Sequence, residues 1–133
     1  MADIDKVQQG KRNRRLGSKW ESDTRTHFEN EGWIIARWTK QVDLTFPDCP
    51  KLVNAKSNRF NMRTCGFPDF ICYKELQEGG RTYEVIGVES KLNGYLSKDE
   101  RIKCRWLIQN KIFSKIIISS KEKGMIEFDK DSS

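Results

Sequence analysis

The sequence has few of the residues that build many metal and redox sites. It contains a single histidine, His27, which excludes a histidine-rich metal site. Its four cysteines include no Cys-x-x-Cys pair, so a zinc site is only weakly indicated. Cys72 and Cys104 lie inside apolar patterns, where buried free thiols are ordinary. We therefore interpret the cysteines as structural. Their positions are Cys49, Cys65, Cys72 and Cys104.

Long apolar runs are also missing. No stretch approaches the roughly 18 apolar residues that span a membrane, and the first residues lack the apolar segment of a signal peptide. We expect a cytoplasmic, nucleoid or nuclear protein that is neither secreted nor embedded in a membrane. An aromatic content of 11%, with four tryptophans, argues against general disorder. A length of 133 residues suits one domain with a single core.

Positive charge is in excess, with 25 Lys and Arg against 19 Asp and Glu and a net charge of +6. This surplus is compatible with binding a polyanion such as nucleic acid, although a simply soluble basic protein is the alternative. The basic residues begin in a polar stretch, 1–17, which we predict to be a flexible leader. Its candidates for contact with DNA phosphates are Lys11, Arg12, Arg14 and Arg15.

The first predicted helix begins at Ser18, because Ser18 and Glu21 have the spacing of a capping box. Gly32 supplies its stop. The near-continuous apolar segment 33–38 predicts a strand that is covered on both faces. No regular apolar pattern runs through residues 39–65, so we predict a long irregular connection there, part of which could form a short strand. Its basic residues suit a substrate-binding loop, and the candidates are Lys56, Arg59 and Arg63.

The central elements are two predicted strands, 66–73 and 85–91, joined as a hairpin through a glycine-containing turn. Side chains alternate along a strand, so Glu89 and Lys91 share a face at the point where the apolar run stops. Asp69 lies at the start of the neighbouring strand. Two carboxylates and an ammonium group can therefore converge at one sheet edge. Such a cluster is costly unless a cation balances it, and hard oxygen ligands favour Mg²⁺ or Mn²⁺.

The remaining pattern predicts a helix followed by one or two strands. Ser97 and Glu100 form a second capping box, and the helix continues to a stop at Asn110. Its exposed face is basic, with Lys98 and Arg101 as candidates for contact with DNA. A buried strand over 115–119 and an edge strand over 123–128 follow. The order α-β-β-β-α-β, with one more strand, predicts an α/β fold with a mixed sheet flanked by helices.

This pattern of Pro68-Asp69, a hairpin and Glu89-Ser90-Lys91 resembles the PD-(D/E)XK nuclease superfamily over residues 17–119. The context of residues 17–21 is similar to that of archaeal Holliday-junction resolvases. The resemblance implies a restriction-endonuclease-like αβββαβ core in a single domain, 18–128, with a tail at 129–133. It also implies that Asp69, Glu89 and Glu21 bind the metal and that Lys91 is the catalytic lysine.

The function implied is that of a Mg²⁺- or Mn²⁺-dependent DNA endonuclease, with branched DNA as the leading substrate. Paired cuts across a junction imply a homodimer, whose interface we expect at exposed apolar residues such as Trp38, Ile112 or Phe113. The long 39–65 connection departs from the resolvase pattern. The alternatives are a restriction-like or repair nuclease acting on duplex, flap or single-stranded DNA, and a nuclease-like fold that binds nucleic acid without catalysis.

Each site residue also has a purely structural interpretation. Glu21 can serve only as the capping partner of Ser18. Glu89 and Lys91 can be an exposed pair on an edge strand, which contributes little to stability. Asp69 can be a turn residue after a proline.

Overall fold

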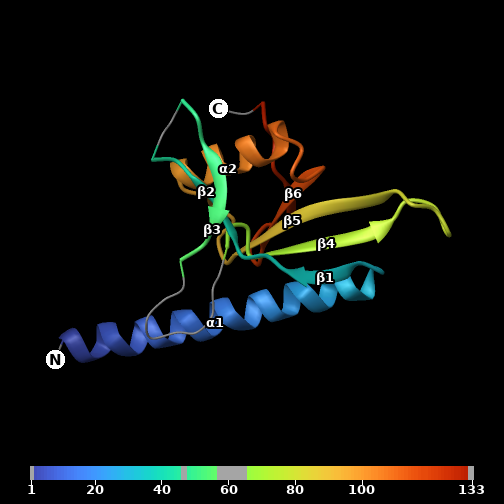
Figure 1. Ribbon diagram of the computed structural model, residues 1–133. Coiled ribbons are helices and arrows are strands. Elements are labelled where there is room, and N and C mark those ends of the chain that lie inside the picture. The colour runs from blue at the N-terminus through green and yellow to red at the C-terminus, as the bar shows by residue number, and fades with distance from the viewer. Residues whose placement is uncertain (1, 46–47, 57–65, 132–133) are drawn as a thin grey trace.

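The computed structural model describes residues 2–45, 48–56 and 66–131. Within these residues the chain forms an α/β fold in which helices flank a mixed five-stranded sheet, and a small two-stranded sheet lies beside it (Figure 1). The elements in chain order are α1 (Ala2–Asn30), β1 (Ile34–Arg37), β2 (Lys40–Asp43), β3 (Lys51–Asn54), β4 (Phe70–Glu75), β5 (Tyr83–Lys91), α2 (Lys98–Gln109), β6 (Lys115–Ser120) and β7 (Gly124–Glu127).

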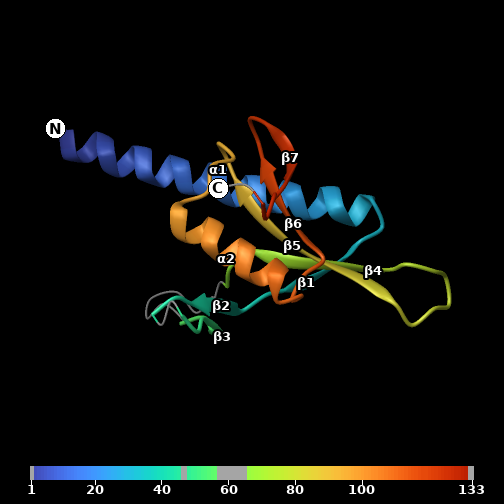
Figure 2. The same ribbon diagram turned by 90° about the horizontal axis from the view of Figure 1, so that it is seen from above.

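The large sheet has the strand order β1-β4-β5-β6-β7. Strands β5 and β6 run parallel, and every other neighbouring pair is antiparallel, so the predicted mixed sheet is confirmed. The parallel pair needs a crossover, which α2 provides. Helix α1 covers one face of the sheet and α2 lies on the other (Figures 1 and 2). Because β5 is central, side chains on both of its faces become buried.

The alternation predicted along β5 is confirmed. Ile86 and Val88 belong to a buried cluster with Phe28 of α1. Val85 packs instead against the cluster that contains Leu107 of α2. The end of β5 therefore carries Glu89 and Lys91 on the α2 side of the sheet, because they continue the face of Val85.

Helix α1 begins at Ala2, so the predicted start at Ser18 is wrong. The segment expected to be a flexible leader, 1–17, is helical from Ala2 onward. Gly10 and Gly17 each cost a helix about 1 kcal/mol relative to alanine, but neither forces it to stop. Gly32, at a φ of 92°, follows the end of the helix as predicted. The first half of α1 extends past the sheet, as Figure 2 shows.

The second half of α1 is held to the sheet by a buried polar contact with β6. The hydroxyl groups of Thr24 and Ser119 lie 2.9 Å apart and both residues are fully buried. The Trp20 indole N–H donates to the backbone oxygen of Ser119 at 2.8 Å. Phe28, one turn beyond Thr24, adds the apolar part of this contact. These bonds fix α1 against the sheet at the level of the sequence-predicted site.

Replacing Thr24 with valine is expected to lower the free energy of unfolding by about 1–3 kcal/mol, because the buried Ser119 hydroxyl loses its partner. Thr26→Val is the matched control. The Thr26 hydroxyl is exposed and bonds only within the helix, to the Ser22 backbone oxygen. Urea unfolding of both variants measures the difference. Equal midpoints for the two would show that the Thr24 contact does not hold the helix.

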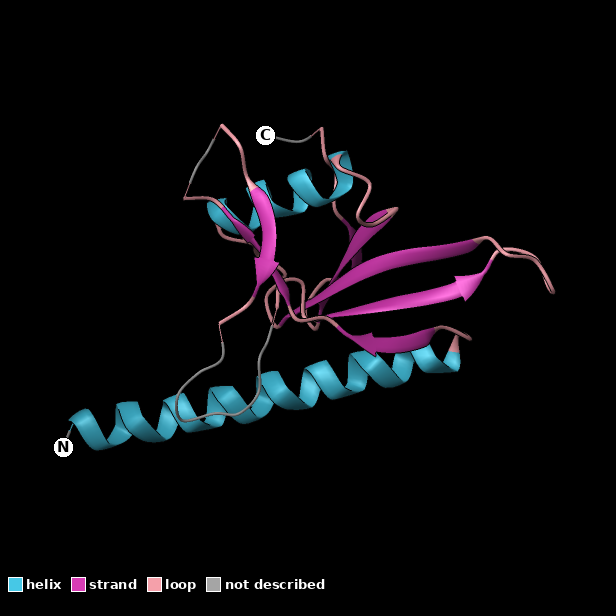
Figure 3. Cartoon of the chain, in the orientation of Figure 1, coloured by secondary structure: helices cyan, strands magenta, loops and turns pink. Residues whose placement is uncertain are grey.

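The described part of the 39–65 connection contains the antiparallel pair β2–β3 (Figure 3), so the short strand allowed by the sequence is present with a partner strand. Val42 is 2% exposed and joins the cluster under α2. Four-residue strands separated by two prolines offer too little alternation to be recognised in the sequence. Lys56 follows this hairpin and is exposed. Arg59 and Arg63 lie outside the described residues.

Three smaller predictions are corrected. Strand β1 lies at an edge of the sheet and Ile34 is 53% exposed, so β1 is not covered on both faces. Asn110 does not take the left-handed conformation, which falls at Lys111 with a φ of 59°. Phe113 is 3% exposed in the core. Trp38 and Ile112 pack against that core. Of the apolar residues expected at a dimer interface, Phe113 is therefore buried, and Trp38 and Ile112 are half-buried against the core.

Candidate active site

The pairing of β4 with β5 brings Asp69 beside Glu89. Phe70 pairs with Val88 in an antiparallel register, so the preceding residue, Asp69, comes opposite Glu89. Gly87 allows this approach: a Cβ atom at that position would lie 2.7 Å from the Pro68 ring and 3.1 Å from the Phe113 ring. The buried proline thus lies against the bare backbone of β5 and sets the position of Asp69.

The Asp69 carboxylate is held by Ser90. The backbone N–H and the hydroxyl of Ser90 both donate to Asp69 Oδ2, each at 2.8 Å. Two bonds to one oxygen restrict the orientation of the carboxylate before any ligand arrives. Ser90 lies between Glu89 and Lys91 on β5, so its side chain points to the opposite face, and both its backbone N–H and its hydroxyl reach Asp69.

Glu89 lies in a costly environment. It is 5% exposed, and its Oε1 has no hydrogen-bond partner. Its other carboxylate oxygen, Oε2, lies 3.6 Å from the Lys91 ammonium group. Burial, and next the negative charge of Asp69, raise the pKa of Glu89 to about 9. A hydrogen bond between the two carboxyl groups raises the pKa of Glu89 further, so the metal-free protein keeps a proton on Glu89 where a cation could bind.

Lys91 is oriented by α2. Its Nζ lies 2.7 Å from Glu100 Oε2, while Glu100 Oε1 accepts the Ser97 backbone N–H at 2.9 Å. The predicted capping box of Ser97 and Glu100 is confirmed, and it ties the site to the start of α2. Partial burial acts to lower the pKa of Lys91, but the bond to Glu100 and the surrounding carboxylates raise it above its usual value. Sequence reasoning recognised Glu100 only as a capping residue.

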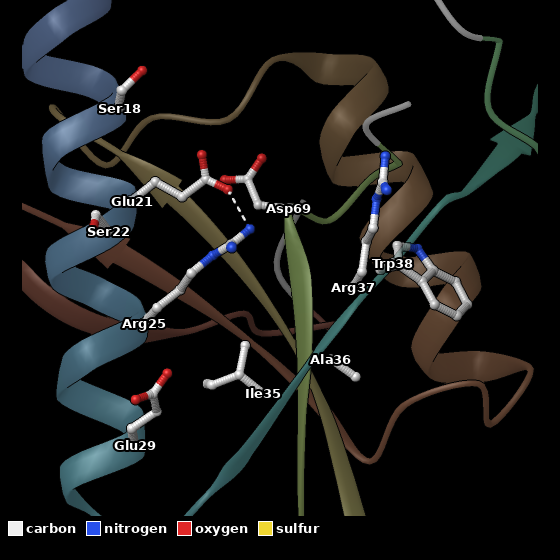
Figure 4. Close-up of a pocket in the computed structure, with 10 residues that line it drawn as sticks. All are labelled: Ser18, Glu21, Ser22, Arg25, Glu29, Ile35, Ala36, Arg37, Trp38 and Asp69. Atoms are coloured by element: carbon white, nitrogen blue, oxygen red, sulfur yellow. Dashed lines mark hydrogen bonds and ion pairs between the residues drawn. The ribbon is translucent and has the colours of Figure 1, made fainter. Parts of the chain in front are cut away.

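A cleft of about 640 Å³ lies next to this cluster, between α1 and β1. Asp69 lines the cleft, and Glu21 of α1 points toward it (Figure 4). Glu21 is also paired with Arg25, whose guanidinium group lies 3.1 Å from Glu21 Oε1. Arg37 of β1 projects into the same region (Figure 4). Structure therefore brings Glu21 to the edge of the site.

Sequence reasoning missed two arginines of this cleft, Arg25 and Arg37. Arg25 stands four residues after Glu21, a spacing at which opposite charges meet on a helix, so this pair could have been found. Nothing local marks Arg37, because its place in the cleft depends on the packing of β1 beside α1.

The capping, edge-pair and turn interpretations do not match the structure at three positions. Glu21 does not cap a helix, because α1 begins well before it. Glu89 is buried in a central strand, so it is not part of an exposed edge pair. Asp69 is bonded through its side chain to β5 and is more than a turn residue. Asp69, Glu89 and Lys91 therefore form one cluster. Glu21 lies near Asp69 across the cleft, which Glu89 and Lys91 do not line.

The donors fit a hard divalent cation. Among the described residues, no group of three or more His, Cys, Asp or Glu side chains is arranged to hold a metal ion. Mg²⁺, however, is usually bound through one or two carboxylates and completed by water and substrate phosphates. Asp69 and Glu89 supply such a pair, and the unpartnered Glu89 Oε1 is an oxygen that a cation would satisfy.

Besides Lys56 after β3, the basic residues predicted to contact DNA lie in two places among the described residues. Lys98 and Arg101 are exposed at the start of α2, on either side of Glu100. The other set is exposed on the first half of α1 and consists of Lys11, Arg12, Arg14 and Arg15. Both sets can therefore meet a ligand.

Two of the cysteines confirm their structural interpretation. Cys72 and Cys104 are free and fully buried. Burial raises the pKa of each thiol to about 12. Both therefore remain protonated and unreactive near neutral pH. Cys49 is free and exposed, and Cys65 lies outside the described residues.

No protein-family model matches this chain, and no curated protein or solved structure matches it. A functional assignment therefore has to come from the site, since one fold can support many unrelated functions. In the part of the chain that the structure describes, no helix has the length and apolar character needed to cross a membrane.

Proposed function

We propose that the protein is a metal-dependent DNA endonuclease of the PD-(D/E)XK type. The observation that carries the proposal is the buried Glu89, whose Oε1 is unpartnered and whose carboxyl group lies beside Asp69 and Lys91. Such a pair is unfavourable alone and favourable around a divalent cation. The element order also agrees with the αβββαβ core of that superfamily, with the β2–β3 hairpin inserted after β1.

In this proposal Asp69 and Glu89 hold Mg²⁺ or Mn²⁺, and Glu21 contributes directly or through water. A bound cation supplies Lewis-acid polarisation of the phosphoryl group and lowers the pKa of bound water. Ser90 keeps Asp69 in position for this role through its two hydrogen bonds. Burial of Glu89 excludes water from one side of the site, which strengthens the electrostatic interactions there.

Lys91 acts by its charge. Its raised pKa keeps the ammonium group protonated, and Glu100 holds it 3.6 Å from Glu89. A fixed positive charge at this place stabilises the negative charge that develops on the phosphate during hydrolysis. The ammonium group can also orient the attacking water as a hydrogen-bond donor.

The preferred substrate in this proposal is branched DNA, such as a four-way junction, and symmetric cutting of a junction requires a homodimer. Linear duplex, flap and single-stranded DNA are the alternative substrates. A second function is supported by the pairing of Glu21 with Arg25, which occupies one of the three expected metal ligands. In that function the fold binds nucleic acid without cutting it.

The test is cleavage of a labelled four-way junction, a flap and a matched duplex with Mg²⁺, Mn²⁺ or EDTA, by the natural protein and by Asp69→Ala. We expect cleavage that requires metal and falls by about 1,000-fold or more in Asp69→Ala, because the cation loses a ligand. DNA binding should remain. Asp48→Ala, at an exposed aspartate distant in sequence from the site, is the matched control.

The substrate panel also separates the alternatives. Paired symmetric nicks made only on the junction support a resolvase, whereas equal cutting of duplex or flap supports a restriction-like or repair nuclease. Binding without cleavage in both metals would contradict the endonuclease proposal and support the non-catalytic function.

A further inference from the structure

Helix α1 carries basic residues along the same face that lines the cleft. Ser18, Ser22 and Arg25 line the cleft from α1, together with the acidic residues Glu21 and Glu29. Lys11 and Arg14 precede Ser18 at intervals of seven and four residues, which places them on that face of the helix. The two serines and the three basic residues are all exposed. The α1 track, as we call Lys11, Arg14, Ser18, Ser22 and Arg25, thus begins on the projecting half of the helix and ends beside Asp69.

The other faces of α1 have different roles. Trp20, Thr24 and Phe28 form the face that packs on the sheet. Arg12 and Lys19 are seven residues apart and so share a third face, about 120° from the track. Both are exposed. The helix therefore offers basic residues both on the track and away from it.

Residues 11–19 contain five basic residues and no acidic residue. Lys11 and Arg15 stand four apart, a spacing at which like charges destabilise a helix. This half of α1 projects past the sheet (Figure 2), so burial in the core does not compensate for the repulsion. A polyanion lying along the helix would relieve it. The chemistry that fits is a sugar-phosphate backbone.

We propose that the α1 track binds the backbone of a DNA strand and leads it into the cleft, where Arg25 and Arg37 flank the site of Asp69. From Lys11 to Arg25 the helix rises about 21 Å, which equals the rise of about six base pairs along the axis of B-form DNA. Arg25 keeps its bond to Glu21 and approaches the Phe70 ring at 5.1 Å, so it enters the cleft at a defined place. This inference deepens the proposed function. It rests on that function only for the statement that the bound strand leads to the metal site.

The experiment compares two double variants that each remove two exposed positive charges. Lys11→Ala with Arg14→Ala alters the track, whereas Lys19→Ala with Arg81→Ala removes one charge from the third face of α1 and one from the turn between β4 and β5. Alanine favours a helix at every position, so neither variant is expected to unfold α1. Fluorescence anisotropy in EDTA, where no metal-dependent cleavage occurs, measures binding to a labelled single strand and to its duplex over a series of salt concentrations.

We expect the track variant to bind at least about 10-fold more weakly and to lower the slope of log K against log salt by about 1 to 2, which corresponds to two lost phosphate contacts. The Lys19→Ala, Arg81→Ala control should bind within about twofold of the natural protein. Equal weakening of both variants, or of neither, would overturn the inference, because binding would then follow total charge or another surface.

Failure of this inference can be told apart from failure of the proposed function. If the natural protein binds through the track in EDTA but never cuts DNA with Mg²⁺ or Mn²⁺, the track inference is supported and the endonuclease proposal is contradicted. If the natural protein cuts DNA and the track variant binds and cuts equally well, the endonuclease proposal is supported and the track inference is contradicted.

Discussion

Replacing Glu89 with glutamine is expected to abolish DNA cleavage while making the metal-free protein more stable near neutral pH. Glutamine keeps the size of the side chain but cannot ionise, so the cation loses a charged ligand and cleavage should fall by about 1,000-fold or more. The buried carboxyl group, with its pKa raised to about 9, disfavours folding once the unfolded chain is ionised. The amide removes that cost.

The stability of the metal-free protein should also depend on pH, in a direction that follows from the pKa of Glu89. The pKa of Glu89 rises from 4.5 in the unfolded chain to about 9 in the folded protein. Between these values the folded state binds the extra proton, so stability is greatest below pH 4.5 and falls as the pH rises toward 9. The decrease is at most about 1.4 kcal/mol per pH unit from this one group. Thermal unfolding in EDTA from pH 5 to 8.5 measures it.

The slope should disappear in Glu89→Gln and remain in Glu122→Gln, which changes an exposed glutamate in the turn before β7. Mg²⁺ should also flatten the slope of the natural protein, because a cation that binds the carboxylate displaces the proton. An unchanged slope in Glu89→Gln would show that Glu89 is not the buried titrating group. Retained cleavage would place the active site elsewhere.

Replacing Gly87 with alanine is expected to damage both stability and cleavage. The added Cβ would lie 2.7 Å from Pro68 Cγ and 3.1 Å from the Phe113 ring, so one of these rings must move. Such overpacking costs about 1–3 kcal/mol of stability. Any shift of Pro68 is passed to Asp69, the next residue, and a displacement of about 1 Å at a reacting group can reduce the rate about 100-fold.

Gly10→Ala is the control for this variant. Nothing lies within 4 Å of a Cβ at Gly10, which is part of α1. We expect it to raise stability by up to about 1 kcal/mol, since alanine favours a helix. Urea unfolding and cleavage of the preferred DNA substrate measure both variants. If Gly87→Ala unfolded and cut like the natural protein, the close contact of Pro68 with β5 would not position Asp69.

The amino-acid sequence by itself determined the features that depend on near neighbours along the chain. The capping box of Ser97 and Glu100 involves groups three residues apart, and the alternation along β5 repeats every second residue. These patterns are visible in the sequence because the interacting groups are close in it. They were sufficient to place Asp69, Glu89 and Lys91 at the ends of two paired strands.

Local signals also misled at one end of the chain. The spacing of Ser18 and Glu21 satisfies a capping box, yet the helix continues through it from Ala2. A cap pattern does not stop a helix when the residues before it can also be helical. The prediction for 39–65 allowed a short strand but not its partner, since the strands of the β2–β3 pair have only four residues each.

Only the tertiary structure decided the chemistry of the site. Glu89 lies close to Asp69, which is 20 positions earlier in the sequence, and Lys91 bonds Glu100, which is 9 positions later. These residues come from the start of β4, from β5 and from α2. The cleft joins α1 to β1, which brings Arg25 and Arg37 to the same place. Burial and electrostatic interactions depend on distance in space, and a sequence pattern records only distance along the chain.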